Sequence, residues 1–105
     1  MLTSAVELER WFDECGDGQA EHWVRIVKKH RPGASVTLPE IIEICLAWGW
    51  VDVKTKRIDD DTYGIRLTPR RPKSNWTERN REIARRLINE GRMQPSGFAK
   101  LPTDF

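Results

Sequence analysis

The chain has 105 residues, of which 38% are hydrophobic and 32% are charged. This length suits one domain with one core, and the composition is too apolar for a disordered chain and too polar for a membrane protein. No apolar run approaches the ~18 residues of a spanning helix, and the first residues lack the basic and apolar regions of a secretory signal. We therefore expect one soluble domain over residues 1–105, located in the cytoplasm and without membrane insertion.

The net charge of +2 is unevenly distributed along the chain. Residues 1–53 hold five Lys and Arg against nine Asp and Glu, whereas residues 54–105 hold thirteen against seven. A basic half of this kind indicates an anionic partner, although a solvated helix face is a common alternative cause.

The first half of the chain predicts two helices and a strand. Ser4 and Glu7 form a capping-box pattern that begins a helix over residues 5–15, and residues 21–29 are rich in β-forming side chains. A second capping box at Thr37 begins a helix that ends at Gly49. We expect this second helix to be central and buried on most sides, because more than one stripe of it is apolar: Leu38, Ile41, Ile42, Ile44, Cys45, Leu46 and Trp48.

A β-hairpin is predicted next, because the apolar period changes to two. Residues 50–57 and 62–68 alternate on either side of an acidic turn. In the first strand, Val51, Val53 and Thr55 share one face. In the second strand, the core-facing residues are Tyr63, Ile65 and Leu67.

The C-terminal part predicts a proline-bounded loop and two further helices. Thr77 caps the first of these helices, which Gly91 ends, and a short last helix begins near Pro95, held by Met93, Phe98 and Leu101. The element order is therefore α-β-α-β-β-α-α. This order predicts an α+β fold with a small, mainly antiparallel sheet of three strands and about four helices packed on it.

The cysteines and histidines of the chain form no disulfide or metal-binding pattern. Cys15 and Cys45 lie in apolar helical patterns without CxxC spacing, so we expect buried free thiols and no disulfide. His22 and His30 belong to no zinc motif, and we predict no metal and no cofactor. Among the five tryptophans, Trp11, Trp23 and Trp48 are predicted in the core, and Trp50 and Trp76 are predicted to be partly exposed.

Three segments stand in order along the chain: Gly49-Trp50-Val51-Asp52, then residues 68–76 (TPRRPKSNW), then Glu90-Gly91-Arg92-Met93 with Gly97. Over about residues 10–100 they resemble the YdeI/OmpD-associated, or bacteriocin-protection, family. The resemblance implies a link to stress or antimicrobial-peptide tolerance and an outer-membrane partner, but no established reaction, cofactor or catalytic residue. That family usually has glycine at the position of Val53, and typical members continue into a second C-terminal segment, whose activity we expect to be absent here.

The candidate binding site is the Arg70–Trp76 loop with the adjacent hairpin, and Pro69 and Pro72 flank the first two residues of this loop. Arg70 and Arg71 stand there just before a helix N-terminus, whose free N–H groups and dipole also attract anions. The predicted ligand-binding residues are Asp52, Lys56, Arg57, Arg70, Arg71, Lys73, Ser74, Trp76 and Asn80. The structural alternative is that the two arginines pair with Asp52, Asp59 or glutamates, and that Trp76 is a helix staple.

Enzyme chemistry has little support, because GxSxG, P-loop and HExxH motifs are absent from the sequence. We therefore predict a non-enzymatic interaction module that binds an anionic ligand or acidic partner through this loop and the adjacent hairpin. One alternative is a small enzyme that uses Asp52 in a pocket, although a salt bridge from Asp52 to Arg57 or Arg70 is a simpler interpretation. The other is a nucleic-acid-binding domain, which would need an uninterrupted basic stripe of Arg70, Arg71, Lys73, Arg79 and Arg86.

Overall fold

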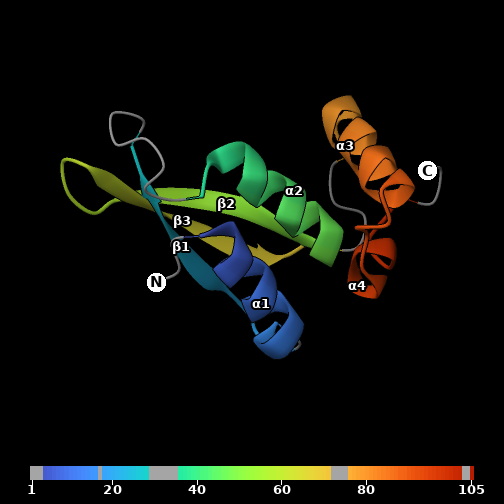
Figure 1. Ribbon diagram of the computed structural model, residues 1–105, viewed down its shortest axis with the longest axis horizontal. Helices are drawn as coiled ribbons and strands as arrows, with labels where there is room; N and C mark the ends of the chain where they lie inside the picture. Colours follow the sequence, from blue (N-terminus) through green and yellow to red (C-terminus); the bar gives the residue numbers. More distant parts are fainter. Residues whose placement is uncertain (1–3, 17, 29–35, 72–75, 103–104) are drawn as a thin grey trace.

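The computed structural model describes residues 4–16, 18–28, 36–71, 76–102 and 105. Within them the elements run in the predicted order (Figure 1): α1 (Ala5–Cys15), β1 (His22–Val27), α2 (Leu38–Trp48), β2 (Trp50–Arg57), β3 (Thr62–Pro69), α3 (Glu78–Asn89) and α4 (Pro95–Phe98). The α+β class with a three-stranded antiparallel sheet is confirmed. None of the described helices is long and apolar enough to cross a bilayer.

Side-chain caps explain where the longer helices begin. The Ser4 hydroxyl accepts a hydrogen bond from the Glu7 N–H at 3.1 Å, and the Thr77 hydroxyl accepts one from the Asn80 N–H at 3.1 Å. At Thr37 the capping box is complete: the Thr37 hydroxyl accepts a hydrogen bond from the Glu40 N–H, and the Glu40 carboxylate accepts one from the Thr37 N–H at 3.0 Å. These bonds satisfy N–H groups that have no partner within the helix, so the predicted starts are confirmed.

The sheet has β3 in the centre, paired antiparallel with β1 on one side and β2 on the other. Ile65 lies opposite Val24 of β1 and Thr55 of β2, and both Ile65 and Leu67 are buried as predicted. The alternation predicted for β2 is wrong at Val53. A β-bulge between Asp52 and Lys54 removes Val53 from the ladder, and its side chain is 49% exposed.

Helix α2 lies between two apolar clusters, as its extended apolar surface predicted. In Figure 1, α1 and α2 both lie over one face of the sheet, while α3 and α4 lie beyond the C-terminal end of α2. The first cluster joins α1, α2 and the sheet through Leu8, Phe12, Ile41, Ile44, Cys45, Val24, Ile26, Ile65, Leu67 and Trp50, with Val36. The second joins α2 to α3 and the C-terminal residues through Leu46, Ala47, Ala84, Leu87 and Met93.

The tryptophans do not follow the predicted division into core and surface. Trp50 is only 5% exposed, because β2 starts on the core face of the sheet, where the Trp50 ring meets Phe12 edge-on at 5.2 Å. Trp11 and Trp48 are only partly buried at the margin of the same cluster. Trp23 is also partly exposed, and β1 directs it away from the helices, opposite Arg66 of β3. The partial exposure predicted for Trp76 is confirmed.

Two further side chains differ from their predicted burial. Both cysteines are free thiols, but Cys15 is exposed at the last residue of α1, whereas Cys45 is buried in α2 and burial raises the pKa of its thiol. Phe98 is 49% exposed, contrary to its predicted role in holding the last helix, and of the three side chains predicted to hold that helix Met93 is the buried one. Apolar periodicity therefore overestimates burial at helix ends, where the core no longer faces the side chain.

Candidate functional site

Arg70, the first residue of the predicted loop and the residue that follows β3, is buried in the protein and is 4% exposed. Its backbone N–H donates to the Gly49 carbonyl at 2.8 Å, and its own carbonyl accepts from the Lys100 ammonium at 2.7 Å. Its guanidinium carbon lies 4.6 Å from the centroid of the Trp76 ring. Burial lowers the pKa of Arg70, while the charge of Asp52 acts in the opposite direction. Arg70 is therefore an internal cation stacked on an indole.

Near Arg70 the structure places part of the predicted site. The Trp76 ring stacks on the Arg70 guanidinium, and the charge of Asp52 acts to raise the pKa of Arg70. Both Asp52 and Trp76 are partly buried. Asn80 is partly buried in the first turn of α3, and Arg71 is exposed. Lys73 and Ser74 lie outside the described residues.

Lys56 and Arg57 lie at the far end of the hairpin from Arg70. Trp50 pairs with Pro69 at one end of the β2–β3 ladder, and Arg57 pairs with Tyr63 at the other, about 20 Å away along the strand. The Arg57 guanidinium forms its ion pair with Asp60, not with Asp52. The predicted residues therefore form two separate groups.

We expect the two neighbouring loop arginines to differ in their effect on stability. Arg70→Ala removes a buried stem and a cation–π contact, and should lower the free energy of unfolding by about 2 kcal/mol. Arg71→Ala, at an exposed position, should change it by less than ~0.5 kcal/mol. Urea unfolding of both variants measures the difference, and equal losses would contradict the structural role of Arg70.

The face of the sheet opposite α1 and α2, here called the outer sheet face, is rich in basic side chains. Register places Trp23 opposite Arg66, and Arg66 opposite Lys54. It also places Arg25 and Lys56 on either side of Gly64. Because successive strand residues alternate between faces, these side chains share one surface that the core does not use.

A shallow depression of about 450 Å³ lies on the outer sheet face, lined by His22, Trp23, Lys56, Ile58 and Gly64. A Cβ atom at Gly64 would lie 3.2 Å from Cε3 of Trp23, so glycine allows the indole to lie close against β3. Ile58 is 43% exposed beside it. The depression thus combines an aromatic surface with a lysine.

The outer sheet face holds more positive charge than its acidic neighbours neutralise. Arg66 pairs with Glu21 at 2.7 Å, and Arg25 lies 3.7 Å from Asp59. A hydrogen bond from the Thr62 hydroxyl is the main cause that lowers the pKa of Asp59. Lys54 and Lys56 are exposed, and neither forms an ion pair within the part of the chain that the structure describes.

Acidic side chains interrupt the arginines of α3. Arg86 pairs with Glu43 and lies 3.8 Å from Glu90, and the hydrogen bond with Glu43 is the main cause that raises its pKa. Arg92 lies 3.6 Å from Glu43 and 3.3 Å from Glu90. The basic stripe required for a recognition helix is therefore interrupted by acids at Arg86.

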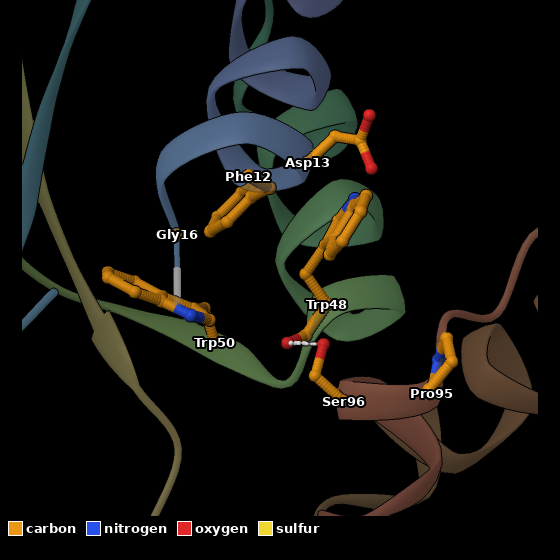
Figure 2. Close-up of a pocket in the computed structure, with 7 residues that line it drawn as sticks. All are labelled: Phe12, Asp13, Gly16, Trp48, Trp50, Pro95 and Ser96. Carbon is orange, nitrogen blue, oxygen red and sulfur yellow. Dashed lines mark hydrogen bonds between the residues drawn. The ribbon is translucent and has the colours of Figure 1, made fainter. Parts of the chain in front are cut away.

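On the other side of the sheet, a cleft of about 330 Å³ opens where α1, α2, β2 and α4 meet (Figure 2). Its aromatic side chains are Phe12, Trp48 and Trp50, and we call it the aromatic cleft. The Ser96 hydroxyl donates to the Trp48 carbonyl at 2.8 Å and ties α4 to the end of α2. The remaining lining residues are Asp13, Gly16 and Pro95.

One family model matches residues 1–100, and its description is Domain of unknown function (DUF8412). The chain belongs to the DUF8412 family. No curated protein and no solved structure matches it. Because the DUF8412 description names no activity, the function is inferred from the geometry.

The sequence predicts Lys56 of the outer sheet face as a site residue, but it does not predict Trp23 beside it or the aromatic cleft of this DUF8412 domain. The local pattern of each residue predicts Trp23 and Trp48 in the core and Trp50 as partly exposed. The signal for the outer sheet face was present, since Trp23 and Arg25 alternate with Val24 and Ile26 along β1. The aromatic cleft joins four elements that are distant in sequence, so no local pattern indicated it.

Proposed function

We propose that this domain is a non-enzymatic interaction module that binds an anionic ligand or an acidic partner through its outer sheet face. The observation that carries the proposal is the pair Lys54 and Lys56, exposed on β2 beside the Trp23 depression. Two ammonium groups near two arginines favour carboxylate or phosphate groups, both by attraction and by hydrogen bonding. The arginines Arg25 and Arg66 extend the same charge across the sheet.

The buried state of Arg70 supports a site on the hairpin rather than in the proline-bounded loop. A residue that is 4% exposed and whose guanidinium is stacked on Trp76 offers little surface to a ligand. Of the predicted site residues, Lys56 lines the depression, so this surface keeps part of the predicted site.

Single-stranded nucleic acid is the alternative partner for the same face. Trp23 beside Lys56 offers an indole on which a base could stack and a cation for the neighbouring phosphate. The Glu43 and Glu90 carboxylates among the arginines near α3 count against a second mode, in which α3 enters the groove of a duplex.

The resemblance to the YdeI/OmpD-associated family, with its link to stress or antimicrobial-peptide tolerance, is also a proposal. Its motif positions have structural roles here. Gly49 ends α2 at φ 80°, Trp50 and Met93 are buried, and Gly97 packs against the Ala47 carbonyl. The shared motif therefore supports a common packing arrangement and identifies no binding residue.

The test compares Lys54→Gln/Lys56→Gln with Arg79→Gln/Arg85→Gln, a double variant on α3 that removes the same charge. The probes are a glutamate-rich peptide, inorganic pyrophosphate and an oligothymidylate, each titrated at two salt concentrations. We expect the lysine variant to bind the anionic probe roughly tenfold more weakly, and the α3 control to bind like the parent protein.

Salt dependence distinguishes the two candidate partners. A single strand on the outer sheet face should lose affinity with a slope of about 0.7 per phosphate contacted in a plot of log affinity against log salt. Preference for the peptide or for pyrophosphate supports the first proposal. Absence of binding by every probe at low salt, or equal loss in both double variants, would contradict it.

A further inference from the structure

The charges at the end of α1 break the usual pattern for a helix C-terminus. Asp13 and Glu14 lie in its last turn, which has no basic residue, and the last turn of α2 has none either. The C-terminal end of a helix carries a partial negative charge, so acidic side chains there are unfavourable and cations are stabilising. Local patterns that lower stability occur preferentially at functional sites.

Both of these helix ends meet at the aromatic cleft (Figure 2). Asp13 belongs to the last turn of α1, Trp48 is the last residue of α2, and Trp50 is the first residue of β2. The Phe12 ring is stacked with the Trp48 ring, with 5.8 Å between the ring centroids. It also meets the Trp50 ring edge-on, with 5.2 Å between the centroids. These contacts fix the aromatic walls, and the volume of about 330 Å³ is enough for one large side chain.

One carboxylate, that of Asp13, lines the cleft, and two more line the groove beside it. Asp13 is exposed and forms no hydrogen bond or ion pair within the described ranges of the chain. A neighbouring groove of about 510 Å³ shares Asp13 and Trp48 with the cleft and adds Glu9 and Glu14. Its two bases are Arg10 and Arg92, of which Arg92 already pairs with Glu43 and Glu90. The surroundings therefore have a net negative charge.

We propose that the aromatic cleft binds the cationic side chain of a lysine or arginine in a partner peptide. The apolar stem would pack against the partly exposed Trp48, whose indole attracts cations, and the charged end would lie beside Asp13. Two helix C-termini favour the same charge. This site has the opposite charge preference to the outer sheet face and lies on the other side of the sheet, so it is a second binding function.

The test uses three probes of the same length on the whole chain. These are n-butylammonium for lysine, n-butylguanidinium for arginine, and n-butanol as the neutral control. Nitrogen-15 NMR of the tryptophan indole N–H groups reports binding at Trp48 and Trp50 separately from Trp23. We expect saturable shifts of these two signals with at least one cation, and binding at least about threefold weaker with butanol.

Asp13→Asn keeps the shape of the rim and removes its charge. We expect it to weaken the binding of the cation by about three- to fivefold, as one exposed ion pair does, and to leave butanol unaffected. Glu82→Gln, an exposed acid on α3, is the matched control and should bind like the parent protein. Equal shifts with cation and butanol, or unchanged cation binding in Asp13→Asn, would overturn the proposal.

Discussion

Trp50→Ala should lower the free energy of unfolding by about 3–5 kcal/mol, as expected when a large aromatic residue is removed from a core. Trp50 is 5% exposed. The centroid of its ring lies 5.2 Å from that of Phe12 and 5.5 Å from that of Trp11, and both pairs meet edge-on. Its removal takes away the contact between the start of β2 and the middle of α1. In a domain of this size, each 1 kcal/mol lost lowers the melting temperature by about 4–8 °C.

Trp23→Ala is the matched control for Trp50→Ala. It removes the same side chain from the outer sheet face, where the indole is partly exposed and lies against Gly64. We expect a loss of about 1 kcal/mol, because less apolar area is buried there. Guanidinium unfolding of the two variants measures the comparison, and a Trp50→Ala loss no larger than that of Trp23→Ala would contradict the central position of Trp50.

Local signals in the sequence were sufficient to predict the elements and their order. Ser4, Thr37 and Thr77 each accept the predicted capping hydrogen bond, because a cap involves residues only three positions apart. Gly49 ends α2 in the left-handed conformation at φ 80°, which glycine adopts without strain. The core-facing residues of β3 followed from its alternation, since Ile65 and Leu67 are buried as predicted.

Features that depend on distant parts of the chain could not be predicted in this way. The burial of Trp50 depends on α1 packing over the start of β2, and the exposure of Val53 depends on a bulge relative to β3. The exposure of Cys15 depends on where α1 extends beyond the core. Each of these outcomes is set by tertiary contacts, which periodicity within one element does not contain.

The candidate site shows the same limit. The sequence identified Arg70 and Lys56 as charged residues of interest, but the ladder of β2 and β3 places them at opposite ends of a hairpin. Neighbouring arginines also look alike in a sequence. Arg70 is nevertheless buried against Trp76, and Arg71 is exposed. Only the pairing of the strands shows which basic side chains are accessible and share one face.

Among the described glycines without a positive φ, Gly97 should be the one whose replacement by alanine is most disruptive, because the backbones of α4 and α2 touch there. A Cβ atom at Gly97 would lie 2.2 Å from the Ala47 carbonyl oxygen and 2.6 Å from the Met93 sulfur. That carbonyl also accepts the Gln94 N–H at 2.9 Å, so it cannot turn away without losing a hydrogen bond. We expect a loss of about 3 kcal/mol, the upper part of the range for overpacking.

Helix propensity acts in the opposite direction at this position but is too small to compensate. Alanine is favoured over glycine in a helix by about 1 kcal/mol, so the backbone clash decides the sign. Gly91→Ala is the control: Gly91 has φ 71° and open space around its Cβ position, so only conformational strain of about 1–2 kcal/mol is expected. Thermal unfolding ranks the two variants, and a Gly97→Ala loss no greater than that of Gly91→Ala would show that α4 can move away from α2 without loss. In that case the indole signal of Trp48 should still report the movement, since Ser96 of α4 is bonded to the Trp48 carbonyl at 2.8 Å.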